Sequence, residues 1–399
     1  MKGSTYMKKL VGISLLASLL IFGHPFMAFA ETIGSRTINY EDLESTIVEQ
    51  NIEVRINENK RLKTHAGYSD LKSDIKDLED ELEDIDRQRD ESRNNPTEFS
   101  QVIALGTEKR MLLNTLEQLK RSEVDQPTLE AITDLQASIS DNSQIRSAEG
   151  IFVGYNQLKL ATADIFSGID IIQDQLVVMQ LQESLGMVSH NNMNDLKTKL
   201  VDMQTKLEST KFQQDSLERQ LRNLLNEENT LVIESIPPAD KDVINEDQDT
   251  DLEKVLENSY NIKLQELQIV SLHNTLDRAK EDHGMSSEQY KMANYELINA
   301  NLKLTQMKDS LKSDYYTMVD DITKMQSNLR LAEQSLEDKK AALSEAQLKK
   351  GLGMISKLEM NEVINAYQAN EKLVKNKQIE LFNSSRGYEW LLKGMSSTT

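Results

Sequence analysis

The chain has 399 residues, and its 46 Lys and Arg are outnumbered by 66 Asp and Glu, giving a formal net charge of −20. It contains 15 Gly, 5 Pro and no Cys, and only 5% of its residues are aromatic. So little glycine and so few aromatic residues argue against an α/β enzyme or a β-sandwich and favour long helices. The lack of cysteine excludes disulfides and thiolate metal sites. The acidic charge argues against a nucleic-acid partner, because phosphate binding needs clustered Lys and Arg.

The first thirty residues have the pattern of a secretory signal peptide. Three Lys precede an apolar run over residues 10–22, and Ala28 and Ala30 supply the small residues that precede a signal peptidase cut. We predict that residues 1–30 are removed, which leaves 43 basic and 66 acidic residues, a net charge of −23. The alternative is an uncleaved membrane anchor, but the run is shorter than the ~20 residues that cross a bilayer.

The four prolines of the exported chain are predicted to mark helix breaks. Pro96 and Pro127 lie in the first half, and Pro237 and Pro238 lie in a linker rich in acidic residues. The stretches between and after them have room for very long helices. From Leu311 onwards, apolar residues alternate in steps of four and three, which predicts a coiled-coil seam. The seam comprises Leu311, Tyr315, Met318, Ile322, Met325, Leu329, Ala332, Leu336, Leu343 and Ala346, with Lys339 as its polar member.

A helical hairpin is predicted in the first half of the exported chain. One apolar heptad pattern leads into Asn94, Asn95 and Pro96, which turn the chain, and a second apolar pattern follows. The first helix carries Leu71, Ile75, Leu78, Leu82 and Ile85, and the second carries Leu105, Leu112, Leu116 and Leu119.

An internal repeat divides the chain into two halves. The pentapeptide Leu185–Ser189 reappears as Leu352–Ser356 at an offset of 167 residues, and the same offset aligns apolar positions on both sides without a gap. We therefore predict an all-α fold of long antiparallel hairpins in two pseudo-symmetric repeats. The predicted parts are the signal peptide at 1–30, a first helical repeat at 31–235 with a coiled-coil insertion at about 69–140, an acidic linker at 236–250 and a second helical repeat at 251–399.

Each repeat is predicted to contain a tight turn between two long helices. Gly186 and Gly353 can adopt the left-handed conformation just past a helix end. Ser189 and Ser356 can cap the helices that follow, and Glu359 completes a capping box with Ser356. Capping alone would account for these residues.

Taken together, these features resemble the TolC-type outer-membrane efflux proteins. The similarity is strongest over 311–394, where Gly353–Glu359 resembles that family's Gly-Leu-Ile-Ser-Arg-Leu-Asp tip, and it extends through the repeat to 144–226. Both repeats end in a Leu-Leu pair, and their openings at 43–56 and 252–264 resemble the family's helix start. The proline expected there is missing, because Asn51 and Asn261 are each followed by Ile.

The resemblance implies a trimeric α-helical duct in an export pump. Its hairpin tips would dock onto a membrane-fusion adaptor, which links to an ABC- or RND-type transporter. The implied docking residues are Gly186, Val188, Ser189, Gly353, Ile355, Ser356 and Glu359. On this resemblance, Val188 and Ile355 are expected to be exposed and to enter the adaptor's groove. The family places such proteins in the outer membrane, but we find no segments with the alternation of membrane strands, so we expect those strands to be absent. The expected location is therefore the cell envelope or the exterior.

No catalytic, metal-binding or cofactor-binding residues are predicted. The histidines of the exported chain show no metal-ligand spacing, and no phosphate-binding or nucleophile motif occurs. Paired acids are expected on solvated helix faces rather than in a catalytic pocket. A second function stays open, namely a secreted coiled-coil scaffold or regulator of envelope proteins that conducts nothing. The histidines concerned are His65, His190, His273 and His283.

Overall fold

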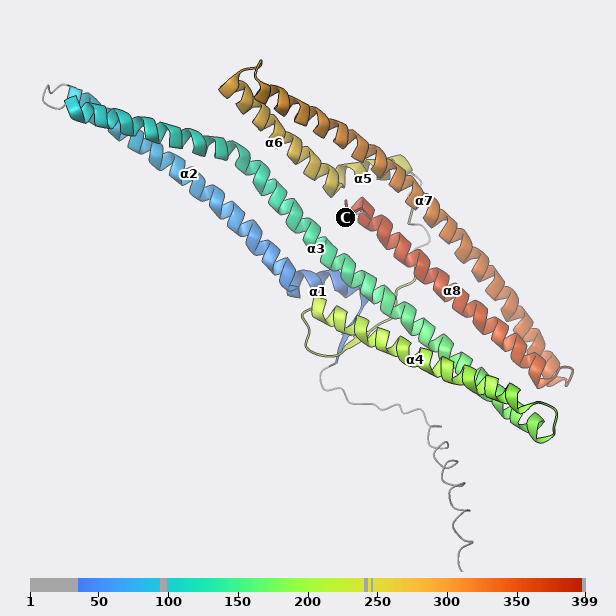
Figure 1. The fold of residues 1–399 in the computed structure, drawn as a ribbon. Coiled ribbons are helices and arrows are strands. Elements are labelled where there is room, and N and C mark those ends of the chain that lie inside the picture. The colour runs from blue at the N-terminus through green and yellow to red at the C-terminus, as the bar shows by residue number, and fades with distance from the viewer. Residues whose placement is uncertain (1–34, 94–98, 240–242, 245–246, 397–399) are drawn as a thin grey trace, which may run out of the picture.

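The protein is an elongated assembly of long helices (Figure 1). The predicted signal peptide, the turn at Asn94–Pro96 and part of the predicted linker lie outside the described residues. The all-α prediction is confirmed, since the strands of the described part are two three-residue segments. The computed structural model describes residues 35–93, 99–239, 243–244 and 247–396.

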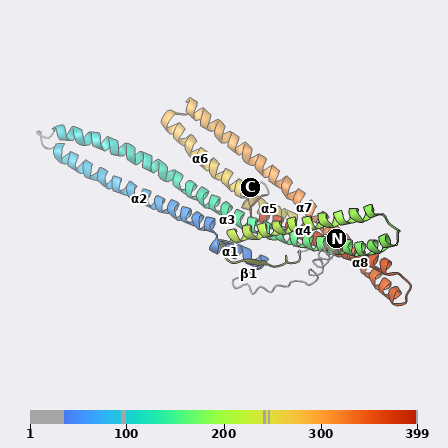
Figure 2. The same ribbon diagram turned by 60° about the horizontal axis from the view of Figure 1, so that its bottom comes forward.

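Four helical hairpins make up the body. The end of α2, the start of α3 and the α6–α7 turn lie at one end of the molecule, and the turns between α3 and α4 and between α7 and α8 lie at the other (Figures 1 and 2). The elements in chain order are β1 (Arg36–Ile38), the short 3-10 helix η1 (Tyr40–Asp42), α1 (Leu43–Gln50), α2 (Ile52–Arg93), α3 (Phe99–Ser184), α4 (His190–Leu224), β2 (Leu231–Ile233), α5 (Gln248–Asn258), α6 (Tyr260–His283), α7 (Glu288–Gly351) and α8 (Lys357–Leu392).

The two halves meet along α3. This helix contacts α2 and α4 of its own half and α6 and α8 of the second half, whereas α7 contacts α5, α6 and α8. The two strands pair in parallel, with Arg36 opposite Leu231 and Ile38 opposite Ile233. This small sheet ties the start of the described chain to the segment that follows α4.

The predicted seam of the second half is present. Leu311, Tyr315, Ile322, Leu329 and Ala332 are all buried in one apolar cluster. Met318 and Met325 are only half-buried, and Val319 is buried in place of Met318. An α-helix has 3.6 residues per turn, so a strict 3.5-residue pattern drifts around its surface over several turns.

The predicted N-terminal hairpin is also present. Seven of its nine seam residues form one cluster, in which Ile75, Leu82 and Leu116 are buried. The other two, Ile85 and Leu105, are buried outside this cluster. The remaining members of the pattern in that cluster are half-buried. The region from 69 to 140 is continuous with the helices on either side of it, as the outer parts of α2 and α3.

The helix break predicted at Pro127 is wrong, because α3 runs unbroken through this residue. A proline removes one backbone hydrogen bond, at a cost of about 3 kcal/mol. Pro127 lies on the exposed side of α3, where water can take the place of the missing donor, and packing against α2 and α6 holds the helix on both sides of it. Proline favours a bend, and α3 visibly bends along its length (Figure 1).

The two repeats open at equivalent helix breaks. Asn51 separates α1 from α2, and its side chain accepts hydrogen bonds from the amides of Glu53 and Val54. In the second repeat the break falls at Ser259, which caps α6, so the alignment of Asn51 with Asn261 is wrong by a few residues. Asn261 lies inside the first turn of α6, because Ser259 offers a cap two residues earlier.

Each of these breaks is tied to the end of its own repeat. The side-chain amide of Asn51 donates to the Leu224 carbonyl at 2.8 Å, and the side-chain amide of Asn258 donates to the Leu392 carbonyl at 2.9 Å. Both acceptors are among the last residues of a descending helix, whose carbonyls have no intrahelical donor. The same contact therefore closes both repeats.

Charged side chains hold the α6–α7 turn against α3. The Arg121 guanidinium donates to both carboxylate oxygens of Asp282 at 2.9 and 2.7 Å. Asp125 pairs with Arg278 and accepts a hydrogen bond from the Asn274 amide at 3.0 Å. The Arg278 guanidinium holds the pKa of the Asp125 carboxyl below its usual value.

We expect Gly394→Ala to destabilise the second repeat. Gly394 has a φ of +99°, and a Cβ atom there would lie 2.2 Å from the Asn258 carbonyl oxygen. Left-handed strain and this backbone clash together should lower the free energy of unfolding by about 3 kcal/mol, measured by urea denaturation followed by circular dichroism. The control is Gly67→Ala on the open surface of α2, which should raise stability by about 0.5–1 kcal/mol. Equal effects would contradict this account of Gly394.

We expect the ion pair between Asp125 and Arg278 to stabilise the fold at pH values above the ordinary carboxyl pKa of about 4. In acid this stabilisation should be lost. Because the folded-state pKa is lowered, the stability gap between the wild type and Asp125→Asn should be full near neutral pH. It should shrink as the pH falls through the folded value. The side chains of Asp125 and Arg278 are about one-third exposed. We therefore expect wild type and variant to differ in unfolding free energy by about 0.5–1 kcal/mol in thermal unfolding. Asp77→Asn, on an exposed face, should show no such gap, and a pH-independent gap at Asp125 would refute the assignment.

Candidate functional site

The first tip connects α3 to α4. Gly186 has a φ of +74°, and the Met187 amide donates to the Gln182 carbonyl at 2.8 Å, which closes the helix end. Ser189 then caps α4 by accepting a hydrogen bond from the Asn192 amide. The predicted helix end and helix start at this tip are therefore confirmed.

The second tip repeats this geometry between α7 and α8. Gly353 has a φ of +71°, and the Met354 amide donates to the Lys349 carbonyl at 2.8 Å. Ser356 and Glu359 form the predicted capping box, with the Ser356 amide donating to Glu359 Oε2 at 2.7 Å. This hydrogen bond holds the pKa of the Glu359 carboxyl below its usual value.

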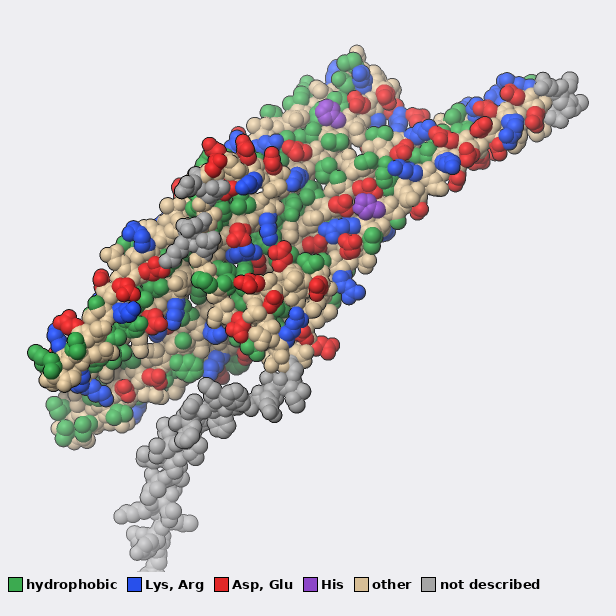
Figure 3. Space-filling view, turned by 180° about the vertical axis from the view of Figure 1, so that it is seen from behind, with side chains coloured by type: hydrophobic (Ala, Val, Ile, Leu, Met, Phe, Trp, Pro, Cys, Tyr) green, Lys and Arg blue, Asp and Glu red, His purple; other side chains and the backbone are tan. Residues whose placement is uncertain are grey.

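The exposed side chains of the tips are not the ones expected. Val188 and Ile355 are half-buried. A residue directly before a helix cap can pack against the fourth residue of that helix, and Met193 at that position in α4 is 2% exposed. The exposed apolar residues are instead those that flank the glycines or start α8, and hydrophobic side chains gather at this end in Figure 3. They are Leu185 (66% exposed), Met187 (69%), Leu352 (75%), Met354 (69%) and Leu358 (70%).

The sequence pattern could have identified these residues. Each glycine turn is built from backbone hydrogen bonds, so the side chains next to the glycine are free to point outward. By the 167-residue offset, Leu185 corresponds to Leu352 and Met187 corresponds to Met354. Both tips present the same kind of surface, a short apolar edge at the end of a helical hairpin.

A buried ionic cluster joins the two halves far from the tips. Glu149 on α3 is 5% exposed, and it accepts a hydrogen bond from Trp390 Nε1 on α8 at 2.6 Å. Arg386 on α8 forms an ion pair with the same carboxylate, and its guanidinium lies 5.4 Å from the centre of the Tyr40 ring. Burial and the Glu149 charge raise the pKa of Tyr40, so its phenol stays protonated. Because Glu149 and Trp390 are buried, the role of this cluster is structural: it holds α3 against α8.

A second buried cluster anchors α5 to the second repeat. The Tyr388 hydroxyl donates to Asp251, which is 3% exposed, at 2.8 Å. The Tyr315 hydroxyl donates to the Gln248 carbonyl at 3.0 Å. Burial raises the pKa of Tyr388, which keeps this donor protonated. Neither cluster was predicted from the sequence, although Trp390 is the one tryptophan of the chain and was a usable signal.

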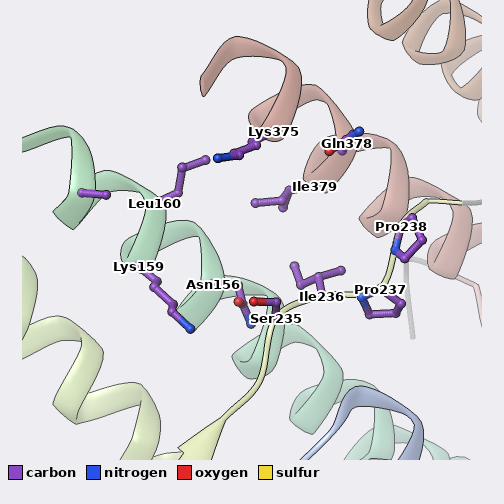
Figure 4. A pocket seen from close by; sticks show the side chains of 11 residues that line it. Asn156, Lys159, Leu160, Ser235, Ile236, Pro237, Pro238, Lys375, Gln378 and Ile379 are labelled. Carbon is purple, nitrogen blue, oxygen red and sulfur yellow. The ribbon is translucent and has the colours of Figure 1, made fainter. Parts of the chain in front are cut away.

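A cavity of about 400 Å³ lies between α3, the segment after β2 and α8 (Figure 4). Ile236 and Ile379 project into the space between the helices, and Lys375 reaches across it. Among the described residues that line it there is no carboxylate.

The histidines of the described helices lie far apart in the fold. His65 lies 3.1 Å from Glu130, and His190 lies 2.8 Å from Glu183. Among the described residues, no three His, Asp or Glu side chains are grouped so that they could hold a metal ion. A search of the same residues finds no helix with an apolar stretch sufficient to span a lipid bilayer.

Comparison with solved structures identifies a TolC-type fold. CusC matches 89% of this chain and 92% of its own chain, with a TM-score of 0.58 and 10% sequence identity. A membrane protein from Pseudomonas aeruginosa matches 90% of both chains, with a TM-score of 0.57 and 10% identity. The outer membrane protein VceC from Vibrio cholerae covers 69% of this chain and 76% of its own, with a TM-score of 0.51 and 10% identity. No protein-family model and no curated protein matches the sequence.

We expect Arg386→Met to destabilise the junction between the halves. The substitution leaves the Glu149 carboxylate buried without its ion-pair partner, which should cost about 3–5 kcal/mol in urea denaturation. Lys340→Met breaks an exposed ion pair with Glu337 and should change stability by less than about 1 kcal/mol. The double variant Glu149→Gln with Arg386→Met should recover part of the loss. A lack of recovery would mean that the loss does not come from the unpaired charge.

Proposed function

We propose that this chain, which has a TolC-type helical fold, is an exported duct subunit of an efflux or secretion pump. The observation that supports this most directly is the pair of glycine-turned tips at one end of the molecule, each with an exposed apolar edge. A similarity to CusC that covers about nine-tenths of both chains supports the same function. We place the protein in the cell envelope, which it would reach by means of the predicted signal peptide.

We further propose that three copies assemble side by side into the duct. Each protomer has α3 at its centre, and the outward faces of its flanking helices carry exposed apolar side chains, which favours burial against another copy. On α7 these include Met292, Tyr295 and Leu302, and on α4 they include Val201 and Phe212. Such a head-to-tail contact closes into a ring when the rotation per copy is a simple fraction of a turn.

The tips are proposed to dock onto a membrane-fusion adaptor that links the duct to an ABC- or RND-type transporter. In this proposal Gly186, Gly353, Ser189 and Ser356 shape the turns, and Glu359 holds the second turn through its capping box. The half-buried Val188 and Ile355 support the turns from within. Contact with the adaptor is made by the exposed residues Leu185, Met187, Leu352, Met354 and Leu358. The proposed role is mechanical and involves no catalysis, metal or cofactor.

We expect the purified mature chain, residues 31–399, to form a trimer in mass measurement by light scattering. Side-by-side burial of the exposed apolar faces supplies the driving force. Tyr295→Asp with Leu302→Asp should shift the mass toward the monomer, while Asp309→Asn on the same helix should not. A stable monomer or dimer of the wild type would favour a scaffold that conducts nothing.

We also expect a photo-crosslinking residue at Met354 to capture an adaptor-class protein in the native cell, identified by mass spectrometry. Met354 is 69% exposed at the tip. The control position is Leu331, which is 54% exposed on the body of α7. Capture of the same adaptor from both positions, or from neither, would contradict docking through the tip.

A further inference from the structure

The two tips match in backbone but differ in charge. The 167-residue offset that aligns Gly186 with Gly353 also aligns Glu183 with Lys350 and His190 with Lys357. In the first tip, Glu183 Oε1 lies 2.8 Å from His190 Nδ1, so this pair bridges the two helices across the turn. In the second tip both positions hold a lysine. Two like charges therefore occupy the positions at which the first tip has an attractive contact.

The carboxylates near the second tip already have partners. Glu345 pairs with Lys349 at 2.6 Å, and Glu359 accepts the Ser356 amide in the capping box. The Lys350 charge acts on Glu359 from a distance, as a minor cause of its lowered pKa. Within the described residues neither Lys350 nor Lys357 forms an ion pair, and both are exposed. The second tip thus presents two ammonium groups without a close counter-charge.

Apolar side chains surround these lysines. Leu348, Leu352, Met354 and Leu358 are 69–75% exposed, so the tip combines a positive pair with an apolar edge. The chain as a whole has the opposite character, with a net charge of −20. An anionic lipid surface would be repelled by most of the molecule, whereas an acidic side chain on a narrow protein hairpin can reach the tip alone. The charge pattern therefore favours a protein partner.

We propose that the α7–α8 tip binds an acidic, apolar helical hairpin of its docking partner, with a partner carboxylate between Lys350 and Lys357. The partner's apolar side chains cover Leu352 and Met354. The α3–α4 tip, whose equivalent positions Glu183 and His190 contact each other, offers no lysine pair, so the two tips hold different parts of the partner. This inference rests on the proposed function, because it gives the chemistry of the surface that docks at the tip.

The test uses three fluorescent helical-hairpin peptides that differ only in the loop, which reads Asp-Leu-Leu-Asp, Asn-Leu-Leu-Asn or Lys-Leu-Leu-Lys. Binding to the mature chain is measured by anisotropy at about 50 mM and about 500 mM NaCl, because salt screens surface charge. We expect the acidic peptide to bind at least about tenfold more tightly than the neutral one at low salt, with the preference lost at high salt. Lys350→Glu with Lys357→Glu should reverse the preference toward the basic peptide.

Two further variants sharpen the test. Glu183→Lys with His190→Lys gives the first tip the charges of the second, so the acidic peptide should gain a second site per chain. Lys339→Glu with Lys340→Glu makes the same change in charge on the body of α7 and should leave the preference unchanged.

Equal binding of the three peptides, no binding, or an acidic preference that survives Lys350→Glu with Lys357→Glu would overturn the proposal. Flotation of the wild type with phosphatidylglycerol vesicles, lost in that variant, would assign the tip to a membrane surface instead. These outcomes are separate from duct assembly, because the peptides bind a single tip. A trimer without the acidic preference would keep the duct and reject the acidic partner.

Discussion

The Glu149 carboxylate, buried between α3 and α8, is the interaction on which the arrangement of the two halves depends. It accepts a hydrogen bond from Trp390 and pairs with Arg386, so one side chain of the first repeat binds two of the second. A buried charge is costly unless its partners are in place, so the halves must meet in one register to satisfy it. Tyr40 packs on the same cluster and brings the start of the described chain to this junction.

This register determines where the tips lie. The α3 and α7 helices are 86 and 64 residues long, and at about 1.5 Å per residue a small rotation at the junction becomes a large displacement at the far end. The salt bridges between α3 and α6 oppose such a rotation at the end away from the tips. Paired capping contacts, from Asn51 to Leu224 and from Asn258 to Leu392, close each repeat near the junction. The helices that carry the tips are thus held in two places, at the Glu149 junction and at the salt bridges between α3 and α6.

Most of the fold could be predicted from the sequence, because it depends on local rules. Heptad spacing identified the seams, and the glycine–serine turns identified both tips, since capping and left-handed glycine are properties of a few neighbouring residues. The failures have tertiary causes. Pro127 is tolerated because α3 is supported by other helices, and Val188 and Ile355 are half-buried because each precedes a cap. The parallel strands and the Glu149 cluster join residues far apart in sequence, which no local pattern reveals.

The pairing of β1 with β2 also affects how the chain folds during its synthesis. Arg36 lies opposite Leu231, about 195 residues later in the chain. Because the N-terminal end is synthesised first, β1 has no partner until α2, α3 and α4 have followed it. Contacts this distant in sequence form slowly, because a long loop has to close before they contribute any stability. The first repeat therefore becomes complete only after its last helix has been made, whereas the α2–α3 hairpin, with its local seam, can form as it emerges.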